Sequence, residues 1–401
     1  MTIAIEGLRE QMEADYFHLH THPELSMQEF ETAKYIEARL DELGIEHFRC
    51  GGTGVVGIVK NGDGPTVGFR ADTDALPILE ESGLEWASTV TADLDGKTVP
   101  VMHGCGHDIH TSVGMATARY MVENKDAWAG TLVFIFQPAE ETAAGSKAMV
   151  EDGIWDKAPK PEIMYGQHVM ALPTGKVACS IGTAMSQADA LKVTLKGRQA
   201  HGSMPQFSID PIVLGSHIVT RLQSVVSRNV DPRDMAVLTV GTFNSGLKEN
   251  IIPETAVLGL NVRTFKTEVR ETVIEGIERT VKGECEASGA TYTIEQLYDF
   301  PLNYNDPDEA VKVMDVLRAE LGDENVLDQP ALSGSEDFGR FAQVIGVPSV
   351  FWLFGGFSED FYADGKTAPP NHSPQFAPTY GPSLETGTRA AVAVLLARVG
   401  K

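Results

Sequence analysis

Hydrophobic positions near the start of the chain recur at the spacing of one helical face. Between residues 30 and 43 the apolar side chains lie about three or four positions apart, as on a helix that packs one side against a core. They are Phe30, Ala33, Ile36, Leu40 and Leu43. Gly44 follows directly and is a typical helix stop. The pattern predicts an amphipathic helix that ends at Gly44.

A second pattern, short apolar runs bounded by turn residues, indicates strands. The nearly continuous apolar run Thr131–Phe136 is typical of a strand that is covered on both faces. Similar runs are Val55–Val59, Thr66–Ala71, Ile163–Gly166 and Val347–Phe354. Helical patterns alternate with them near 112–124, 308–321 and 384–399. We therefore expect an α/β domain built on an open sheet.

The pattern changes from about Ala190 onward. Segments of strand and helix character follow one another in the order βαββαβ over roughly 110 residues, which is typical of a ferredoxin-like α+β unit. The segments are 190–196, 211–228, 235–243, 256–264, 268–287 and 291–297. We predict that residues 187–298 form this unit, inserted into an α/β domain made of residues 1–186 and 299–401.

Composition limits the classes of protein that remain. With 401 residues, 42% of them hydrophobic, the chain can bury the core of one large domain or two ordinary ones. The formal charge of −24 disfavours nucleic acid and anionic membranes as partners. No apolar run approaches the roughly 20 residues of a membrane helix, and the acidic N-terminus lacks the pattern of a secretory signal. The four widely spaced cysteines do not resemble a disulfide framework, so we expect a cytoplasmic protein.

Soft metal-binding groups are concentrated in residues 102–110. Cys105 and His107 are separated by one glycine, so a thiolate and an imidazole can reach the same ion from a single turn. These ligand types suit zinc and neighbouring transition metals. The alternative is a buried structural cysteine beside polar residues that cap a helix, and the ligand chemistry favours the metal site.

Two pairs of acids follow predicted strands. Asp72 and Asp74 come after one strand, and Glu140 and Glu141 come after the next. In open α/β sheets the functional groups gather beyond the carboxyl ends of the strands. The two aspartates can bind a metal or orient a group that does, whereas one of the adjacent glutamates can bind a metal while the other acts as a base. A turn held by aspartate side chains, or a solvated loop, is the alternative for each pair.

Two more histidines complete a possible ligand set. His168 lies at the end of the predicted strand 163–166, and His372 lies in a loop rich in glycine and proline. Together with Cys105, His107 and Glu141 they exceed one closed tetrahedral site and suit two metal ions about 3.5–4 Å apart.

The histidines near the N-terminus have a simpler interpretation. His18, His20 and His22 precede Pro23, and no acid or cysteine lies beside them in a ligand pattern. We interpret them as the polar end of a helix that stops before the proline.

Taken in order, these motifs resemble the aminoacylase, hippurate hydrolase and indole-acetyl-amino-acid hydrolase branch of the dinuclear zinc metallopeptidase superfamily. The resemblance runs nearly from end to end of the chain. Its markers are residues 22–26 (HPELS), 69–77 (FRADTDALP), 104–108 (GCGHD), 137–141 (QPAEE), 167–168 (QH), 335–338 (SEDF) and 371–374 (NHSP). It implies a zinc-peptidase-like catalytic domain and an inserted lid or dimerisation domain, through which a homodimer forms.

The resemblance also implies roles for the site residues. The metal ligands would be Cys105, His107, Glu141, His168 and His372. Glu140 would be the general base. Either Asp72 or Asp74 would supply an acid that orients or tunes the site; the sequence leaves this choice open, with a preference for Asp72. Two divalent ions are implied, with zinc as the default and manganese, cobalt or nickel as alternatives.

Three residues of the inserted domain match functional positions of such enzymes. His201 matches a histidine that stabilises the oxyanion, often from the neighbouring subunit. Asn250 and Arg263 match positions that bind the carboxylate or carbonyl of the substrate, although Asn250 can equally be a turn residue. Gln206 is a departure, since relatives often carry a second histidine there.

The implied reaction is hydrolysis of an N-acyl amino acid to a carboxylic acid and a free amino acid. A dipeptidase, a carboxypeptidase-like exopeptidase and an N-acetyl-diaminopimelate-type deacetylase are the enzyme alternatives. A binding protein that keeps the fold is the non-enzyme alternative, and the intact Glu140 with its full ligand set argues against it. The sequence does not identify the acyl group or the amino acid.

Overall fold

The chain folds into two compact units. The computed structural model describes residues 3–401, the side chain of Asp364 excepted. Unit 1 comprises the chain up to Ala184 together with Tyr304–Pro330 and Asp337–Lys401, and unit 2 comprises Met185–Asn303 and Ala331–Glu336. The short segment Ala331–Glu336 lies in unit 2 because the Ser186 N–H donates to the carbonyl groups of Leu332 and Gly334. The prediction ended the inserted unit at residue 298 and therefore missed that Ala331–Glu336 also belongs to unit 2.

Unit 1 is built on a mixed sheet that has eight strands within residues 3–401. In spatial order these are β1 (Glu46–Cys50), β2 (Gly54–Asn61), β6 (Gly130–Gln137), β3 (Thr66–Asp72), β7 (Ile163–Pro173), β18 (Ser349–Phe357), β8 (Val177–Cys179) and β17 (Val326–Asp328). The four central strands β6, β3, β7 and β18 run parallel. Their carboxyl ends therefore meet at one edge of the sheet. A separate hairpin is formed by β4 (Thr91–Leu94) and β5 (Lys97–Pro100).

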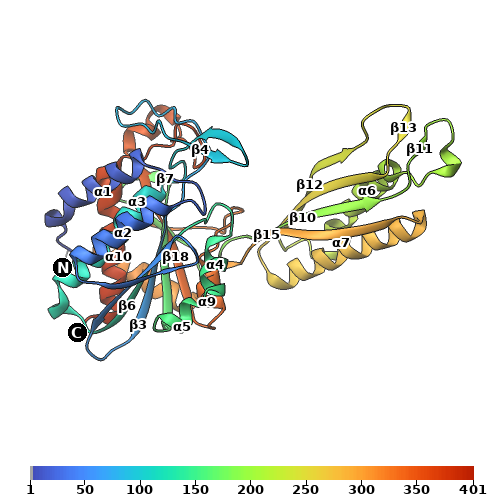
Figure 1. The fold of residues 1–401 in the computed structure, drawn as a ribbon. Helices are drawn as coiled ribbons and strands as arrows, with labels where there is room; N and C mark the ends of the chain where they lie inside the picture. Colours follow the sequence, from blue (N-terminus) through green and yellow to red (C-terminus); the bar gives the residue numbers. More distant parts are fainter. Residues whose placement is uncertain (1–2) are drawn as a thin grey trace. The chain divides into compact units, whose positions relative to one another are not determined.

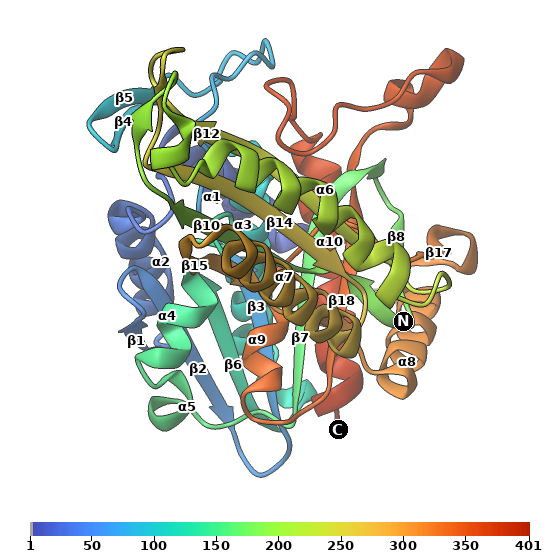
Figure 2. The ribbon, with the colours of Figure 1, turned by 90° about the vertical axis from the view of Figure 1, so that its right-hand side faces the viewer.

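Helices cover both faces of this sheet (Figure 1, Figure 2). They are α1 (Arg9–Thr21), α2 (Phe30–Glu42), α3 (His107–Glu123), α4 (Gly145–Glu151), α5 (Ile154–Lys157), α8 (Pro307–Leu321), α9 (Gly339–Gln343) and α10 (Tyr380–Val399). α3 and α10 pack on the central strands, while α4 and α9 pack on β6 and β7. Strand β18 is buried along its whole length because both of its faces are covered.

Two local predictions for unit 1 were wrong. The helix predicted from Ser112 begins at His107, after Gly106 adopts the left-handed conformation with φ 84°. The polar residues His107, Asp108 and His110 hid its first turn, since these three side chains are buried without being apolar. The strand predicted over 163–166 continues to Pro173, because β18 pairs with it throughout.

The histidines near the N-terminus belong to the end of α1. The helix stops at Thr21, two residues before Pro23. Both ring nitrogens of the buried His20 have partners: Nδ1 lies 2.7 Å from Asp108 Oδ2, and Nε2 lies 3.2 Å from Glu80 Oε1. These contacts give His20 a structural role within unit 1.

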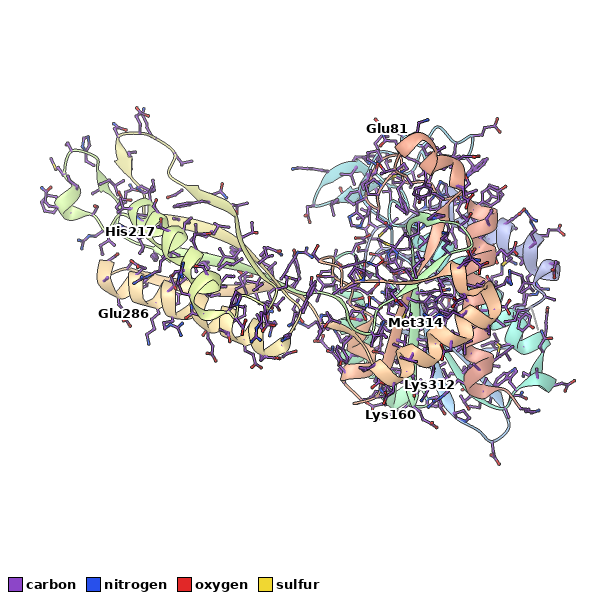
Figure 3. All side chains as sticks on the ribbon, turned by 180° about the vertical axis from the view of Figure 1, so that it is seen from behind. Glu81, Lys160, His217, Glu286, Lys312 and Met314 are labelled. Carbon is purple, nitrogen blue, oxygen red and sulfur yellow. The ribbon has the colours of Figure 1, made fainter. Side chains whose placement is uncertain are left out.

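Unit 2 pairs an antiparallel sheet with two long helices. In its described residues the sheet has four strands in the order β12 (Ala236–Ser245), β14 (Thr255–Thr264), β10 (Gln187–Lys196) and β15 (Thr291–Phe300). Alternate side chains of β14, among them Leu258 and Leu260, are buried together with the apolar side chains of the helices α6 (Pro211–Asn229) and α7 (Thr267–Ser288). In Figure 3, the labelled His217 and Glu286 mark these two helices. The chain order of these elements is βαββαβ.

Two further properties concern the whole described chain. No helix in residues 3–401 is both long enough and apolar enough to cross a membrane. Cys50, Cys105, Cys179 and Cys285 are all free thiols, and all four are buried.

Candidate metal centre

The predicted ligands of unit 1 converge where the central strands end. The loop after β3 carries Asp74, and the loop after β6 carries Glu140 and Glu141. Cys105 lies just before α3, and His107 is its first residue. One ligand atom each from Cys105, His107 and Glu141 lies within 4.8 Å of the others. The structure thus brings together a thiol, an imidazole and a carboxyl group from two separate parts of the sequence.

The other two predicted ligands adjoin this cluster. Nε2 of His168 lies 3.4 Å from Sγ of Cys105. Nε2 of His372 lies 3.2 Å from Oε1 of Glu141. His168 was expected at the end of a strand but lies within β7, so the strand itself fixes the direction of its side chain. All five predicted ligands therefore lie around one place in unit 1.

Hydrogen bonds at the far side of two rings fix their tautomers. His107 Nδ1 lies 2.9 Å from the carbonyl oxygen of Asp74, which only accepts, so Nδ1 carries the proton. His168 Nδ1 donates in the same way to the carbonyl of Val169, at 2.7 Å. When these rings are neutral, as imidazole ligands of metals are, the Nε2 lone pair of each ring faces the cluster. This is the arrangement by which proteins hold histidine ligands to metals.

Two buried atoms of the cluster lack the hydrogen bond that burial normally requires. Among the residues that the structure describes, His107 Nε2 and Glu141 Oε1 make no hydrogen bond, and their nearest contacts are themselves groups of the cluster: Asp72 Oδ2 at 3.5 Å and His372 Nε2 at 3.2 Å. Buried polar groups are rarely left unpaired, because each loses its hydration without compensation. Both atoms are metal-ligating types and belong to the same cluster. The residues present therefore fit a bound cation.

The electrostatics of the cluster also favour a bound cation. Burial opposes the charge on His107, yet the nearby carboxylates of Asp72, Asp74 and Glu141 raise its pKa to about 10. Burial and the same kind of negative surroundings raise the pKa of the Cys105 thiol. A site that holds a proton on an imidazole this strongly favours positive charge. A divalent cation at that position would satisfy the carboxylates and allow Cys105 to ionise.

Asp74 holds three parts of the centre at once. Its Oδ1 lies 3.1 Å from His107 Nδ1 and accepts the Glu140 N–H at 3.1 Å. Its Oδ2 accepts the Glu141 N–H at 3.1 Å and the Ser26 hydroxyl at 2.6 Å. A single carboxylate thus orients one candidate ligand and fixes the backbone of both acids.

Asp72 has a different environment. It forms a buried ion pair with Arg70, whose Nη1 lies 2.7 Å from Oδ2, and it is hydrogen-bonded to Nδ1 of His110. Its Oδ2 lies 3.5 Å from His107 Nε2, but it makes no contact with the backbone of the two glutamates that is comparable to those of Asp74. The geometry favours Asp74 over Asp72 as the acid that orients the site, against the preference drawn from the sequence.

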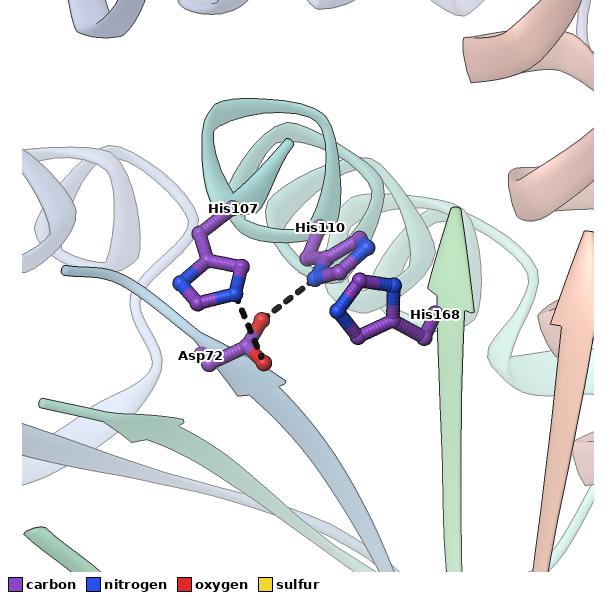
Figure 4. Close-up of side chains that lie close together, drawn as sticks. All are labelled: Asp72, His107, His110 and His168. Atoms are coloured by element: carbon purple, nitrogen blue, oxygen red, sulfur yellow. Dashed lines mark hydrogen bonds and ion pairs between the residues drawn. The ribbon is translucent and has the colours of Figure 1, made fainter. Parts of the chain in front are cut away.

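His110 is a site residue that the sequence analysis did not select. It lies one turn after His107 on α3 and close to Asp72 and His168 (Figure 4). Both of its nitrogens are occupied, because Nε2 accepts the Val169 N–H at 2.7 Å and Nδ1 is bonded to Asp72. His110 thus links β3 to β7 beside His168 and has no lone pair left for a metal. The i, i+3 spacing from His107 would have indicated it had the helix been predicted to begin at His107.

Asn371 joins the loop of His372 to the rest of the centre. Its Nδ2 donates to the carbonyl groups of Cys105 at 3.3 Å and Val169 at 3.2 Å, and lies 3.7 Å from Sγ of Cys105. The next residue, His372, adopts a positive φ of 67°, and its N–H donates to the Gly104 carbonyl at 2.7 Å. These contacts hold a non-glycine residue in a conformation that it rarely adopts.

The remaining predicted residues, His201, Asn250 and Arg263, lie in unit 2. Nδ1 of His201 accepts the Ser203 N–H at 3.1 Å, so the proton of the neutral ring is on Nε2. Nη1 of Arg263 donates to the Ser333 carbonyl at 2.9 Å, and its Nε lies 3.2 Å from Asn261 Oδ1. Asn250 accepts the Gly202 N–H through its carbonyl group at 2.9 Å.

An α/β fold with a buried Cys, His and carboxylate cluster at the carboxyl ends of its strands defines a class, the metal-dependent hydrolases of α/β type. Comparison of the sequence with known protein families identifies the family within this class. Residues 68–397 match the model of peptidase family M20/M25/M40, and the chain belongs to this family. As the resemblance implied, it is a family with a dinuclear metal-binding member of solved structure.

Individual relatives agree over most of the chain. The hippurate hydrolase of Campylobacter jejuni is 37% identical over 85% of this chain and 87% of its own length. An indole-acetic-acid (IAA) amino acid hydrolase of Arabidopsis thaliana, ILR1-like 2, is 36% identical over 84% of this chain and 75% of its own. The YxeP protein of Bacillus subtilis, a dinuclear metal-binding peptidase of family M20, aligns over 98% of this chain and 99% of its own with 29% identity and a TM-score of 0.77.

Proposed function

We propose that this protein is a metal-dependent amidohydrolase that cleaves N-acyl amino acids to a carboxylic acid and a free amino acid. The observation that carries the proposal is the pair of buried atoms without hydrogen-bond partners, His107 Nε2 and Glu141 Oε1, beside Cys105 within the described part of the chain. Family membership supplies the reaction class, since relatives at this level of identity are named as hydrolases of hippurate and of IAA-amino acid conjugates.

The proposed centre holds two divalent ions. Cys105, His107, Glu141, His168 and His372 would hold them, and zinc is the expected ion for this mixture of thiolate, imidazole and carboxylate. Manganese, cobalt and nickel accept the same ligand types. When bound, such a pair of ions makes water a nucleophile near neutral pH and polarises the amide carbonyl.

Glu140 is the proposed general base. It lies three residues after the end of β6 and is 6% exposed, and its backbone N–H is held by Asp74 beside the candidate ligand Glu141. A base in this position takes a proton from the attacking water and returns it to the nitrogen of the leaving amine. Asp74, and not Asp72, is the proposed orienting acid, because it holds both His107 and the two glutamates.

Unit 2 is proposed to be a ferredoxin-like lid or dimerisation domain, with residues 187–298 at its centre. Its chain order βαββαβ and its strand order support this. His201 is proposed to stabilise the oxyanion, since the bond from Ser203 leaves the Nε2 proton of His201 available to donate. Arg263 and Asn250 are the proposed contacts for the substrate, and a homodimer through this unit is the proposed assembly.

The proposed location is the cytoplasm. The four free, buried thiols suit a reducing compartment.

A panel assay tests the function. The substrates are N-acyl amino acids with short, long and aromatic acyl groups, unblocked dipeptides and N-acetyl-diaminopimelate, each with and without chelator. Chelator-sensitive release of amino acid from the acylated set is the expected result. Cleavage of the unblocked dipeptides alone would replace the proposal with a dipeptidase. No cleavage after addition of zinc, manganese, cobalt or nickel would contradict an amidohydrolase of these substrates.

A further inference from the structure

The turn that carries the two glutamates is held by carboxylates from two other segments. Three consecutive backbone N–H groups point at them: Ala139 donates to Oε1 of Glu29 at 2.8 Å, Glu140 to Oδ1 of Asp74 at 3.1 Å, and Glu141 to Oδ2 of Asp74 at 3.1 Å. The role of Asp74 follows from its contact with His107, whereas Glu29 touches none of the proposed ligands and has no role in the proposed function.

Glu29 is itself fixed and fully buried. Its exposed fraction is 0%. Oε1 accepts a second N–H, from Met27, at 3.0 Å, and Oε2 accepts the hydroxyl of Thr53 at 2.6 Å. A carboxyl group removed from water in this way is costly to bury unless its hydrogen bonds compensate. Its bonds to Met27 and Thr53 also set the direction in which it meets Ala139.

The turn requires such support because of its backbone conformation. Ala139 has a φ of 49° and Ala143 a φ of 56°, values in the left-handed region that residues with a side chain rarely adopt. Conformations of this kind persist only where the surroundings impose them. Without the bond to Glu29, Ala139 would relax towards ordinary φ values, and the direction of Glu140 and Glu141 would change with it.

We infer that Glu29 is a positioning residue for the Glu140–Glu141 pair, an inference that rests on the proposed function. The HPELS motif, residues 22–26, lies directly before this region. Within that segment Glu24 caps α2 by accepting the N–H groups of Glu31 at 3.1 Å and Thr32 at 2.8 Å, and Ser26 donates to Asp74 at 2.6 Å. The segment from Glu24 to Glu29 thus links the start of α2 to the acids of the centre.

Variants of Glu29 separate positioning from general stability. Glu29→Ala removes the acceptor for Ala139, whereas Glu29→Gln keeps a carbonyl oxygen for Ala139 and an amide that can donate to Thr53. Thr53→Val removes only the hydrogen bond that the Thr53 hydroxyl donates to Oε2 of Glu29. Glu24→Ala is the matched control, because it also deletes a carboxylate that accepts two backbone N–H groups, those of Glu31 and Thr32, but Glu24 makes no hydrogen bond to residues 139–141 in the described structure.

The experiment measures two quantities on each folded variant. Hydrogen–deuterium exchange of peptides covering residues 138–145 reports the backbone of the turn and needs no substrate. Steady-state kinetics with the best substrate of the panel gives kcat and KM. Glu29→Ala is expected to speed exchange on the order of tenfold and to lower kcat on the order of 10- to 100-fold with KM nearly unchanged, as for a misplaced catalytic group. Glu29→Gln is expected to restore most of both, and Glu24→Ala to change neither.

The outcomes decide the inference independently of the substrate. Unchanged exchange in 138–145 for Glu29→Ala would overturn it, even if activity fell. If Glu29→Ala does not fold, Thr53→Val takes its place, and exchange and kcat equal to wild type in that variant would overturn the inference. If the wild type cleaves none of the panel, the proposed function fails while the exchange measurement still shows whether Glu29 holds the turn.

Discussion

Asp74 and Glu140 are joined through the backbone: Oδ1 of Asp74 accepts the Glu140 N–H at 3.1 Å, and the same oxygen lies 3.1 Å from Nδ1 of His107. A candidate metal ligand and the proposed base are therefore fixed by one atom. Any displacement of Asp74 moves both. This coupling explains how acids from one loop and a histidine from the start of a helix can keep a constant relative geometry.

Glu140 and Glu141 should have separable roles. Glu140→Gln is expected to lower kcat about 10²- to 10⁴-fold and to leave the metal content unchanged, because a base is lost but no ligand. Glu141→Gln is expected to lose metal. Metal analysis of both purified variants, together with kcat, checks this. Retained metal in Glu141→Gln and lost metal in Glu140→Gln would mean that the two roles are exchanged.

Asp74 should matter for metal affinity in addition to catalysis. Asp74→Ala removes the contact with His107 Nδ1 and both backbone acceptors, so the affinity for metal is expected to fall about 10- to 100-fold, as for other partners behind a ligand. Competition with a chelator of known affinity measures it. Asp72→Asn provides the comparison, and a larger loss of affinity in Asp72→Asn than in Asp74→Ala would reverse the assignment.

Much of this arrangement could be read from the sequence, and the exceptions have physical causes. Cys105, His107, Glu141 and His168 could be selected because ligand chemistry requires those residue types. Glu29 could not, since an acid that accepts backbone N–H groups leaves no periodic pattern and no motif of its own. Its position is set by pairing between distant segments.

Contacts between distant segments and polar burial also explain what the sequence analysis missed or left open. The start of α3 at His107 was missed because helix prediction relies on an apolar face, and three of the first four residues of this helix, His107, Asp108 and His110, are polar. The choice between Asp72 and Asp74 was left open by the sequence, because it depends on which carboxylate meets the loop after β6. That contact lies about 65 residues away along the chain, beyond what local propensity encodes.

Removal of the metal should destabilise unit 1. Chelation would leave Glu141 buried beside Cys105 and the acids without a compensating cation. A ligand that binds only the folded state stabilises it by about 4 kcal/mol when present at roughly 1,000 times its Kd, so the Tm is expected to fall by several degrees on chelation. Thermal unfolding with chelator, and after addition of each metal in turn, measures this. An identical Tm with and without metal would argue against a bound cation at the cluster.

Arg263 should recognise the carboxylate of the substrate. Nε and Nη1 are held within unit 2, and in the described residues Nη2 has no hydrogen bond, so one edge of the guanidinium can meet an anion. Arg263→Ala is expected to raise KM about 10- to 100-fold for an N-acyl amino acid. The methyl ester of the same substrate is the control, because it should bind the variant and the wild type alike. An unchanged KM for the free acid would remove Arg263 from the site.

His20 should make the stability of the protein depend on pH. Burial opposes its charge, but hydrogen bonds with Asp108 and Glu80 raise its pKa to about 9 from the ordinary 6.5. Since the folded state holds the proton more tightly, the stabilisation is fully present below pH 6.5 and is lost as the pH rises through 9. The difference between the two pKa values corresponds to about 3 kcal/mol of stability.

The free energy of unfolding is measured in urea at several pH values for wild type and His20→Gln. The comparison with the variant removes the contributions of groups that do not contact His20, so the difference between the two proteins is expected to shrink between pH 6.5 and 9. A difference that stays constant over this range would show that His20 is neutral in the folded protein, and that its contacts with the two acids stabilise it as an uncharged ring.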